Sequence, residues 1–138
     1  IMMDKIIEEH GLSIRGLAKN LWMKNDHLEY LAKDGHELGL HSYSHPNTMS
    51  VLPRERQFEE YKKNYDHIKT ISRRAPLAMA YPVNSYNKDT KDILKRLGII
   101  CGFRSNMHPW RKDKRLNPTA LDMVREDHAN IISMIKTI

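Results

Sequence analysis

Short segments with strand-like patterns alternate along the chain with longer stretches in which apolar residues recur every three or four positions. The first kind predicts β-strands, and the second predicts helices with one buried face. The predicted strands span residues 36–40, 77–81, 99–103 and 121–124. Strands separated by helices are typical of parallel β-α-β units, so the pattern predicts an α/β fold. In such folds functional side chains collect at the carboxyl ends of the strands.

Residues that favour helix ends delimit the predicted helices. The expected starts are a cap at Asn25 or Asp26, a first-turn proline at Pro53, a cap at Asn87 and a cap at Asp127. Gly35 and Gly98 are expected to end the first and third of these helices. The helix after Pro53 is expected to turn its periodic apolar residues toward the core, and these are Phe58, Tyr61, Tyr65 and Ile68.

The composition is that of an ordinary globular chain, and 138 residues fit a single domain. No apolar run reaches the roughly 18 residues of a membrane span, and the first residues lack a signal-peptide pattern. The compartment therefore stays open, with the cytoplasm as the default. Cys101 is the single cysteine, which excludes an intrachain disulfide and a cysteine-rich zinc site. It lies in an apolar run and is expected to be a small buried side chain.

The net charge of +6 is concentrated in the second half of the chain. The most basic segment, 104–115, contains Arg104, Arg111, Lys112, Lys114 and Arg115. We expect this segment to form an exposed, irregular loop. Such a patch also attracts nucleic acid or an anionic glycan, but no recognition helix, aromatic platform or zinc-finger spacing accompanies it.

Two histidines directly follow the first predicted strand. His41 and His45 are separated by three residues, which is a common spacing for metal ligands. Each imidazole offers one ring nitrogen to a zinc ion if the turn brings the two rings together. Histidines with this spacing also occur without any metal, so the pair alone leaves both interpretations open.

The residues around this pair favour the metal-binding interpretation. Residues 35–46 run Gly-His-Glu-Leu-Gly-Leu-His-Ser-Tyr-Ser-His-Pro. This segment resembles the second motif of the polysaccharide deacetylases (carbohydrate esterase family four), in which a His-Ser/Thr-x-x-His motif binds metal. Residues 80–87, Ala-Tyr-Pro-Val-Asn-Ser-Tyr-Asn, are similar to the third motif of that family, and residues 97–104 resemble the following helix-strand step. The resemblance extends over roughly residues 21–132.

The resemblance implies a partial, distorted (β/α) barrel of the polysaccharide deacetylase type, with its first strand missing. It implies a metal-dependent hydrolase that removes N-acetyl or O-acetyl groups from a sugar polymer or glycan precursor. The implied cofactor is a divalent metal, zinc first and cobalt or another ion as alternatives, with His41 and His45 as ligands. The backbone N–H of Val83 would stabilise the oxyanion of the reaction. The residues implied to line the sugar groove are Tyr81, Pro82, Asn84 and Tyr86.

Three features depart from the family pattern. The paired aspartates of the family's first strand have no counterpart, and residues 6–12 read as the helix that follows that strand, so we expect the aspartates upstream of Ile1. Ala80 stands where many members have the arginine that orients the catalytic base. The family's leaving-group histidine sits in a Leu-x-His motif that is absent here. His128 is one candidate for that role, Arg125 could instead face the site, and helix capping is the alternative use of this segment.

These observations leave three classes of function. The first is a deacetylase acting on an N-acetylated polysaccharide or oligosaccharide, of which residues 1–138 alone would bind metal weakly and would not deacetylate. The second is a non-catalytic carbohydrate-binding relative of the same fold. The third, a nucleic-acid-binding module, rests on charge alone and is disfavoured. A zinc nucleobase deaminase is excluded, because its Cys-x-x-Cys pair requires two cysteines.

Overall fold

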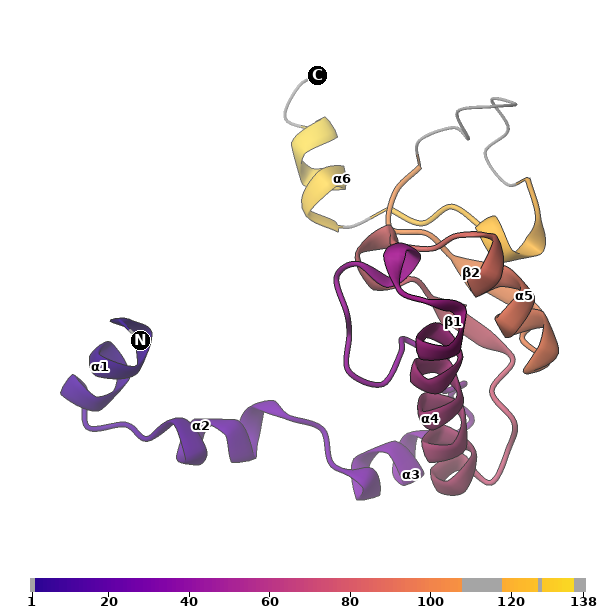
Figure 1. Cartoon of the computed structure of the whole chain (residues 1–138). Coiled ribbons are helices and arrows are strands. Elements are labelled where there is room, and N and C mark those ends of the chain that lie inside the picture. The colour runs from indigo at the N-terminus through magenta and orange to yellow at the C-terminus, as the bar shows by residue number, and fades with distance from the viewer. Residues whose placement is uncertain (1, 108–117, 127, 136–138) are drawn as a thin grey trace.

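The computed structural model describes residues 2–107, 118–126 and 128–135. Its α-helices are α1 (Met2–Glu9), α2 (Ile14–Leu21), α3 (Asn25–Lys33), α4 (Arg54–Ser72), α5 (Lys88–Arg96) and α6 (His128–Ile135). The strands in the described part are β1 (Ala78–Ala80) and β2 (Cys101–Phe103). Short 3₁₀ helices follow some of these elements, namely η1 (Met49–Val51), η2 (Pro82–Asn84) and η3 (Ala120–Asp122). Figure 1 shows β1, β2, α4 and α5 gathered in one body, with α1 and α2 extending away from it.

The two strands form a small parallel sheet, and they pair over their whole lengths. One residue extends the sheet on each side, because Leu40 pairs with Met79 and Met123 pairs with Phe103, both in parallel. Helix α4 connects Leu40 to β1, and α5 connects β1 to β2. The predicted α/β pattern of parallel β-α-β units is therefore confirmed.

The predicted strand 36–40 is wrong in extent. Only Leu40 pairs with the sheet, and its N–H donates to the carbonyl of Ala78 at 2.9 Å. The N–H of Leu77 donates to Oε1 of Glu37 at 3.2 Å. A side chain, not a backbone ladder, therefore links residues 36–39 to the segment before β1 at this point.

The predicted strand 121–124 is also wrong in extent. Oγ1 of Thr119 accepts the N–H of Leu121 at 3.2 Å, and the carbonyl of Thr119 accepts the N–H of Asp122 at 2.9 Å. These two bonds curl the chain into η3, so only Met123 pairs with β2. The turn also directs the Asp122 side chain inward, where it is fully buried.

The core lies where α4 and α5 meet the sheet. Its buried side chains include Tyr61 and Ile68 from α4, Met79 and Tyr81 from the β1 segment, and Ile93 and Leu94 from α5. Phe58 and Tyr65 are half-buried against this cluster, so the predicted inward face of α4 is confirmed. Gln57 and Thr90 join the two helices inside the core, where Oγ1 of Thr90 donates to Oε1 of Gln57 at 2.6 Å.

Most of the predicted helix ends agree with the structure. Asn87 caps α5, and Gly98 follows that helix with a φ of +82°, which suits glycine. The predicted cap of α3 is wrong, because α3 begins at Asn25 and Lys24 occupies the cap position in place of Asn25 or Asp26. The predicted cap at Asp127 lies outside the described residues.

The amino-terminal helices contribute little to the core. α1 and α2 expose much of their apolar surface, and the exposed side chains on and beside them include Ile6, Leu12, Ile14, Leu21, Trp22 and Met23. Among the helices that the structure describes, none combines the length and the apolar character needed to cross a bilayer.

Arg104 departs from the predicted exposed loop 104–115. Its residue is only 3% exposed, its N–H donates to the carbonyl of Met123 at 2.8 Å, and its Nη2 donates to the carbonyl of Asn106 at 3.4 Å. This arginine is thus a buried part of the β2 end. Residues 108–117, which hold the other cations of the segment, lie outside the described residues.

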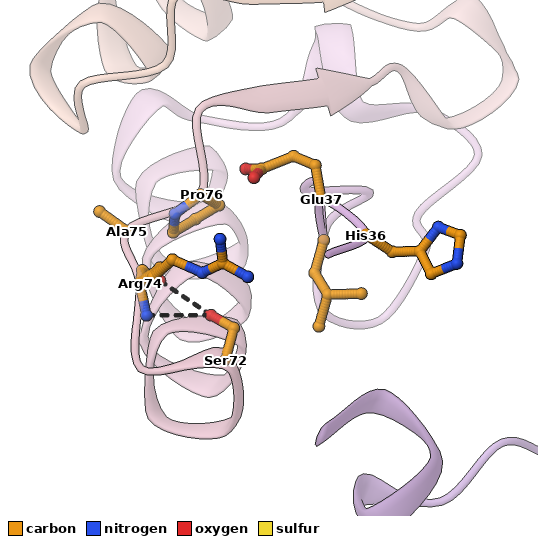
Figure 2. A pocket seen from close by; sticks show the side chains of 7 residues that line it. His36, Glu37, Ser72, Arg74, Ala75 and Pro76 are labelled. Carbon is orange, nitrogen blue, oxygen red and sulfur yellow. Dashed lines mark hydrogen bonds between the residues drawn. The ribbon is translucent and has the colours of Figure 1, made fainter. Parts of the chain in front are cut away.

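The amino-terminal edge of the sheet is held by short polar contacts. Nη2 of Arg74 donates to the carbonyl of Ala32 at 2.6 Å, which ties the chain after α4 to the end of α3. Figure 2 shows a small pocket at this edge, between residues 36–38 and 72–76, with Ser72 hydrogen-bonded to the backbone of Arg74. His36 lies at this edge with an exposed side chain, 3.6 Å from a carboxylate oxygen of Asp34.

Candidate metal and substrate site

His41 and His45 lie at the opposite, carboxyl edge of the sheet, directly after Leu40. Their ring centroids are 4.9 Å apart, and the ring planes are tilted by 55°. Nδ1 of His41 lies 2.8 Å from the carbonyl oxygen of Ala80, and its backbone N–H donates to Oδ1 of Asn64 at 2.9 Å. A carbonyl oxygen can only accept, so Nδ1 of His41 carries the proton and its Nε2 keeps a lone pair. That is the tautomer in which a histidine binds a metal through Nε2.

The loop around the two histidines has an unusual backbone. Ser42 has a φ of 67° and His45 a φ of 56°, in the left-handed region that non-glycine residues rarely adopt. Oγ of Ser42 accepts the N–H of His45 at 3.1 Å, which closes the turn and holds the second ring near the first. Such backbone strain persists only where surrounding contacts impose it, and it is common at functional sites.

Glu60 of α4 supplies much of that constraint. Its Oε2 accepts the N–H of Tyr43 at 3.1 Å and the N–H of Ser44 at 2.8 Å, and its Oε1 accepts the Ser44 hydroxyl at 2.8 Å. Burial alone would raise the pKa of Glu60, but the hydrogen bonds from Ser44 and Tyr43 outweigh it and hold the pKa below its usual value. The ionised carboxylate is therefore the form that anchors the histidine loop to α4.

The turn after β1 forms the second part of the site. Val83 has φ 48° and ψ 26°, and Asn84 has a φ of 57°, so both residues are left-handed. The Val83 side chain is 60% exposed, while Oδ1 of Asn84 accepts the N–H of Ser105 beyond β2 at 3.2 Å. A left-handed conformation is costly for a β-branched residue, which makes this turn a strained position like the histidine loop.

Two of the predicted groove residues are buried. Tyr81 is 1% exposed and its hydroxyl donates to the carbonyl of Leu121 at 2.7 Å, while Pro82 is fully buried. Their side chains therefore support the turn from inside, and a sugar could not reach them in this conformation. Asn84 and Tyr86 are half-buried and remain reachable from solvent.

A buried polar network lies behind this turn. The Tyr86 ring stacks on the Tyr81 ring at 3.9 Å between centroids, and its hydroxyl donates to Oδ1 of Asp122 at 3.0 Å. Asp122, which is 0% exposed, also accepts from Thr119 Oγ1 and from Nζ of Lys91 at 2.6 Å to Oδ1 and 2.8 Å to Oδ2. Burial would raise the pKa of Asp122, but the bonds from Lys91, Thr119 and Tyr86 hold it below its usual value. Burial raises the pKa of both tyrosines, so they stay protonated donors.

The predicted leaving-group acid, His128, is exposed at the first position of α6. Arg125, predicted as the alternative residue that faces the site, is exposed, and its Nε donates to the carbonyl of Arg104 at 3.2 Å.

The residues that sequence patterns missed are the supports of the site. Glu60 and Asn64 hold the histidine loop from one side of α4, four residues apart, and Asp122 holds Tyr86. Polar residues at helical spacing next to the apolar face of a helix are a signal that could have pointed to Glu60 and Asn64. Nothing local in the sequence marks Asp122 as buried.

The donor chemistry of the histidine pair fits a divalent metal such as zinc, because imidazole nitrogens are ligands that zinc prefers. In the part of the chain that the structure describes, no group of three or more His, Cys, Asp or Glu side chains could hold a metal ion. The described site thus offers two imidazoles, whereas a catalytic zinc site normally uses three protein ligands.

Comparisons with known proteins agree with this arrangement. A family profile described as polysaccharide deacetylase matches residues 2–101. The YlxY protein of Bacillus subtilis, described as uncharacterised, is 32% identical over 102 residues, which cover 71% of this chain and 32% of that protein. The chain therefore spans about a third of the length of the curated relative that it matches.

Solved structures show the same fold. The Streptococcus pyogenes deacetylase PplD, solved in complex with acetate, superposes with a TM-score of 0.65 at 19% identity, covering 98% of this chain and 62% of that one. The BpsB deacetylase domain of Bordetella bronchiseptica superposes with a TM-score of 0.60 at 17% identity, covering 76% of this chain and 48% of that one. BA3943 of Bacillus anthracis is described as a pseudoenzyme of carbohydrate esterase family four. It superposes with a TM-score of 0.54 at 16% identity, covering 98% of this chain and 52% of that one.

Proposed function

Because the chain belongs to the polysaccharide deacetylase family, we propose that it forms the metal-binding part of a hydrolase that removes acetyl groups from a sugar polymer or glycan precursor. The observation that carries the proposal is the histidine pair at the carboxyl edge of the sheet. Its rings are 4.9 Å apart, and the bond from His41 Nδ1 to the Ala80 carbonyl leaves Nε2 available. We also propose that residues 1–138 belong to a single domain of this family.

In this proposal His41 and His45 hold a divalent metal, zinc first and cobalt or another ion as alternatives. When bound there, the metal would polarise the acetyl carbonyl and increase the acidity of water. A carboxylate ligand and a carboxylate base are expected from the paired aspartates that the family carries on its first strand.

The residues after β1 would handle the acetyl group itself. The backbone N–H of Val83 would stabilise the negative charge that develops on the carbonyl oxygen. Asn84 and Tyr86, which are half-buried beside this turn, would contact the sugar. Tyr81 and Pro82 would keep the turn in place. His128 remains the candidate for the leaving-group acid, with Arg125 as the alternative residue that faces the site.

A non-catalytic carbohydrate-binding protein is the second candidate function. It is favoured by the similarity to a protein described as a pseudoenzyme. The nucleic-acid-binding alternative loses one of its five cations, because Arg104 is buried.

The test compares residues 1–138 with the natural coding sequence extended upstream through the expected aspartates. Both proteins are assayed with zinc or cobalt for acetate release from N-acetylated oligosaccharides. We expect acetate release from the extended protein alone, since a missing general base typically costs about 10²–10⁴ in rate and the carboxylate ligand is lost as well. Equal activity of the two proteins would contradict the proposal.

Matched variants of the extended protein separate the two candidate functions. His41→Ala is expected to abolish acetate release, whereas His36→Ala, an exposed histidine at the opposite edge, is expected to leave it unchanged. If the extended protein binds oligosaccharide but releases no acetate with any divalent metal, the non-catalytic alternative holds.

A further inference from the structure

We propose that a hollow beside the histidine loop binds a sugar ring of the polymer, next to the sugar that loses its acetyl group. This inference rests on the proposed function, because it assigns a second part of the same substrate. The hollow has a volume of about 480 Å³, and it is lined by Tyr43, Lys63, Asp66, His67 and Thr70. Apart from Tyr43, all of these residues belong to α4.

Tyr43 connects the hollow to the metal site, because it lies between His41 and His45 in the chain. Its backbone N–H is held by Glu60, so the position of the residue is set by the same carboxylate that anchors the histidine loop. Its side chain is 61% exposed, so the ring is accessible to a ligand. An exposed ring in this place offers an apolar face against which the C–H groups of a sugar can pack.

The polar groups of the hollow match the hydroxyl groups of a sugar. Lys63 donates, Asp66 accepts, and Thr70 and His67 can do both. Nζ of Lys63 lies 5.9 Å from the centroid of the Tyr43 ring, so a donor already stands beside the aromatic surface.

The lining carries both a donor and an acceptor of charge-assisted hydrogen bonds, Lys63 and Asp66. Both oxygens of Asp66 are held by Nζ of Lys62 at 2.6 and 2.7 Å, which fixes the carboxylate in place. A phosphate or sulfate would meet this carboxylate, whereas a hydroxyl group can donate to it. We therefore assign the hollow to a neutral sugar ring of the polymer.

Helix α4 explains why the hollow and the metal site belong to one surface. Glu60 and Asn64 hold the loop at residues 41–44, and one turn further along the same helix lie Lys63 and His67. A polymer chain whose acetyl group reaches His41 and His45 would meet Tyr43 next as it leaves over α4.

The experiment measures binding, not catalysis. A tetramer of N-acetylglucosamine is titrated into the metal-free full-length protein, and the dissociation constant is measured by calorimetry or by nuclear magnetic resonance. Tyr43→Ala is expected to weaken binding about tenfold, which is the scale of one well-placed aromatic contact. Tyr43→Phe is expected to bind like the unchanged protein, since it retains the ring.

Tyr30→Ala is the matched control, because Tyr30 is an equally exposed tyrosine on α3 and does not line the hollow. Equal weakening by Tyr30→Ala and Tyr43→Ala, or no effect of Tyr43→Ala, would overturn the assignment. The assignment would also be overturned if an oligophosphate competes with the tetramer and binds more tightly than the tetramer does. A protein that binds the tetramer through Tyr43 but releases no acetate with any divalent metal would disprove the deacetylase proposal and leave this one standing.

Discussion

The two edges of the small sheet differ in how their backbone is built. Of the five non-glycine residues with positive φ in the described part of the chain, four follow Leu40 or β1 at the carboxyl edge: Ser42, His45, Val83 and Asn84. The fifth, Arg73, ends α4, where a left-handed residue is ordinary. At the amino edge, contacts such as Glu37 to Leu77, and Ser72 to Arg74 in Figure 2, fasten segments without such strain. The difference indicates that this fold concentrates its strained conformations where the proposed chemistry takes place.

The largest expected effect comes from removing the support of the carboxyl edge. Asp122→Ala would leave the Lys91 ammonium and the Tyr86 hydroxyl without their buried acceptor. We expect the free energy of unfolding to fall by about 3 kcal/mol, the lower end of the range for breaking a buried pair, because Lys91 is partly exposed. Urea denaturation followed by circular dichroism measures this change.

Asp122→Asn is the control for the charge of that side chain. It keeps an acceptor for Tyr86 and nearly the same volume, so we expect a loss of about half the alanine value. If both variants unfold like the unchanged protein, the polar network does not support the carboxyl edge.

A smaller effect is expected from Glu60→Gln, which keeps the shape of the side chain but removes its charge. Three hydrogen bonds from the histidine loop to a carboxylate become bonds to a neutral amide. We expect a loss of about 1.5 kcal/mol at pH 7, since bonds to charged groups are the stronger kind. The amide signals of Tyr43 and Ser44 are expected to shift more than those of residues at the amino edge.

Acid is expected to act on the same contacts. The folded-state pKa values of Glu60 and Asp122 are lowered, so the unfolded chain binds more protons as the pH falls. Their contribution is therefore fully present above about pH 5 and is lost as the pH drops from about 4 toward the lowered values. Urea midpoints measured between pH 7 and pH 3 check this, and Glu60→Gln should show a shallower acid loss. An equal slope for both proteins would contradict the assignment to Glu60.

The smallest effect is expected at the amino edge. Arg74→Ala removes the bond to the carbonyl of Ala32, but that carbonyl still accepts the N–H of Gly35 at 3.4 Å. We expect a loss of about 0.5–1 kcal/mol and no change in metal or oligosaccharide binding. If Arg74→Ala lowers the free energy of unfolding more than Glu60→Gln does, the amino edge is the more important of the two edges for stability, contrary to this expectation.

The helices of the body could be predicted because their signals are local. Each signal lies in or beside the helix that it defines. Examples are the Asn87 cap and the Gly98 stop of α5, and the three-and-four spacing along α4. The strands 36–40 and 121–124 were predicted too long, because strand length depends on partners far away in the chain. The Thr119 side chain accepts the N–H of Leu121, and the Glu37 side chain accepts the N–H of Leu77. No pattern within a short segment reveals these side-chain bonds.

The candidate site divides in the same way. His41 and His45 could be found because they share one short motif. Their supports could not, because Glu60 and Asn64 approach them only after α4 has folded back along the sheet. In the segment 104–115 all cations were predicted to be exposed, but Arg104 is buried. A run of basic residues does not show which of its side chains the fold encloses.

The contact that orients His41 has an evolutionary consequence. Its acceptor is the backbone oxygen of Ala80, and the strand that presents this oxygen is kept in line by the Leu40 and Met79 pairing. Every amino acid has such an oxygen, so residue 80 is free to diversify while the imidazole keeps its tautomer. A survey that replaces side chains one at a time would record this position as dispensable. Only an insertion or deletion that slips β1 by one residue would take this acceptor away from His41 and so reveal what the strand contributes.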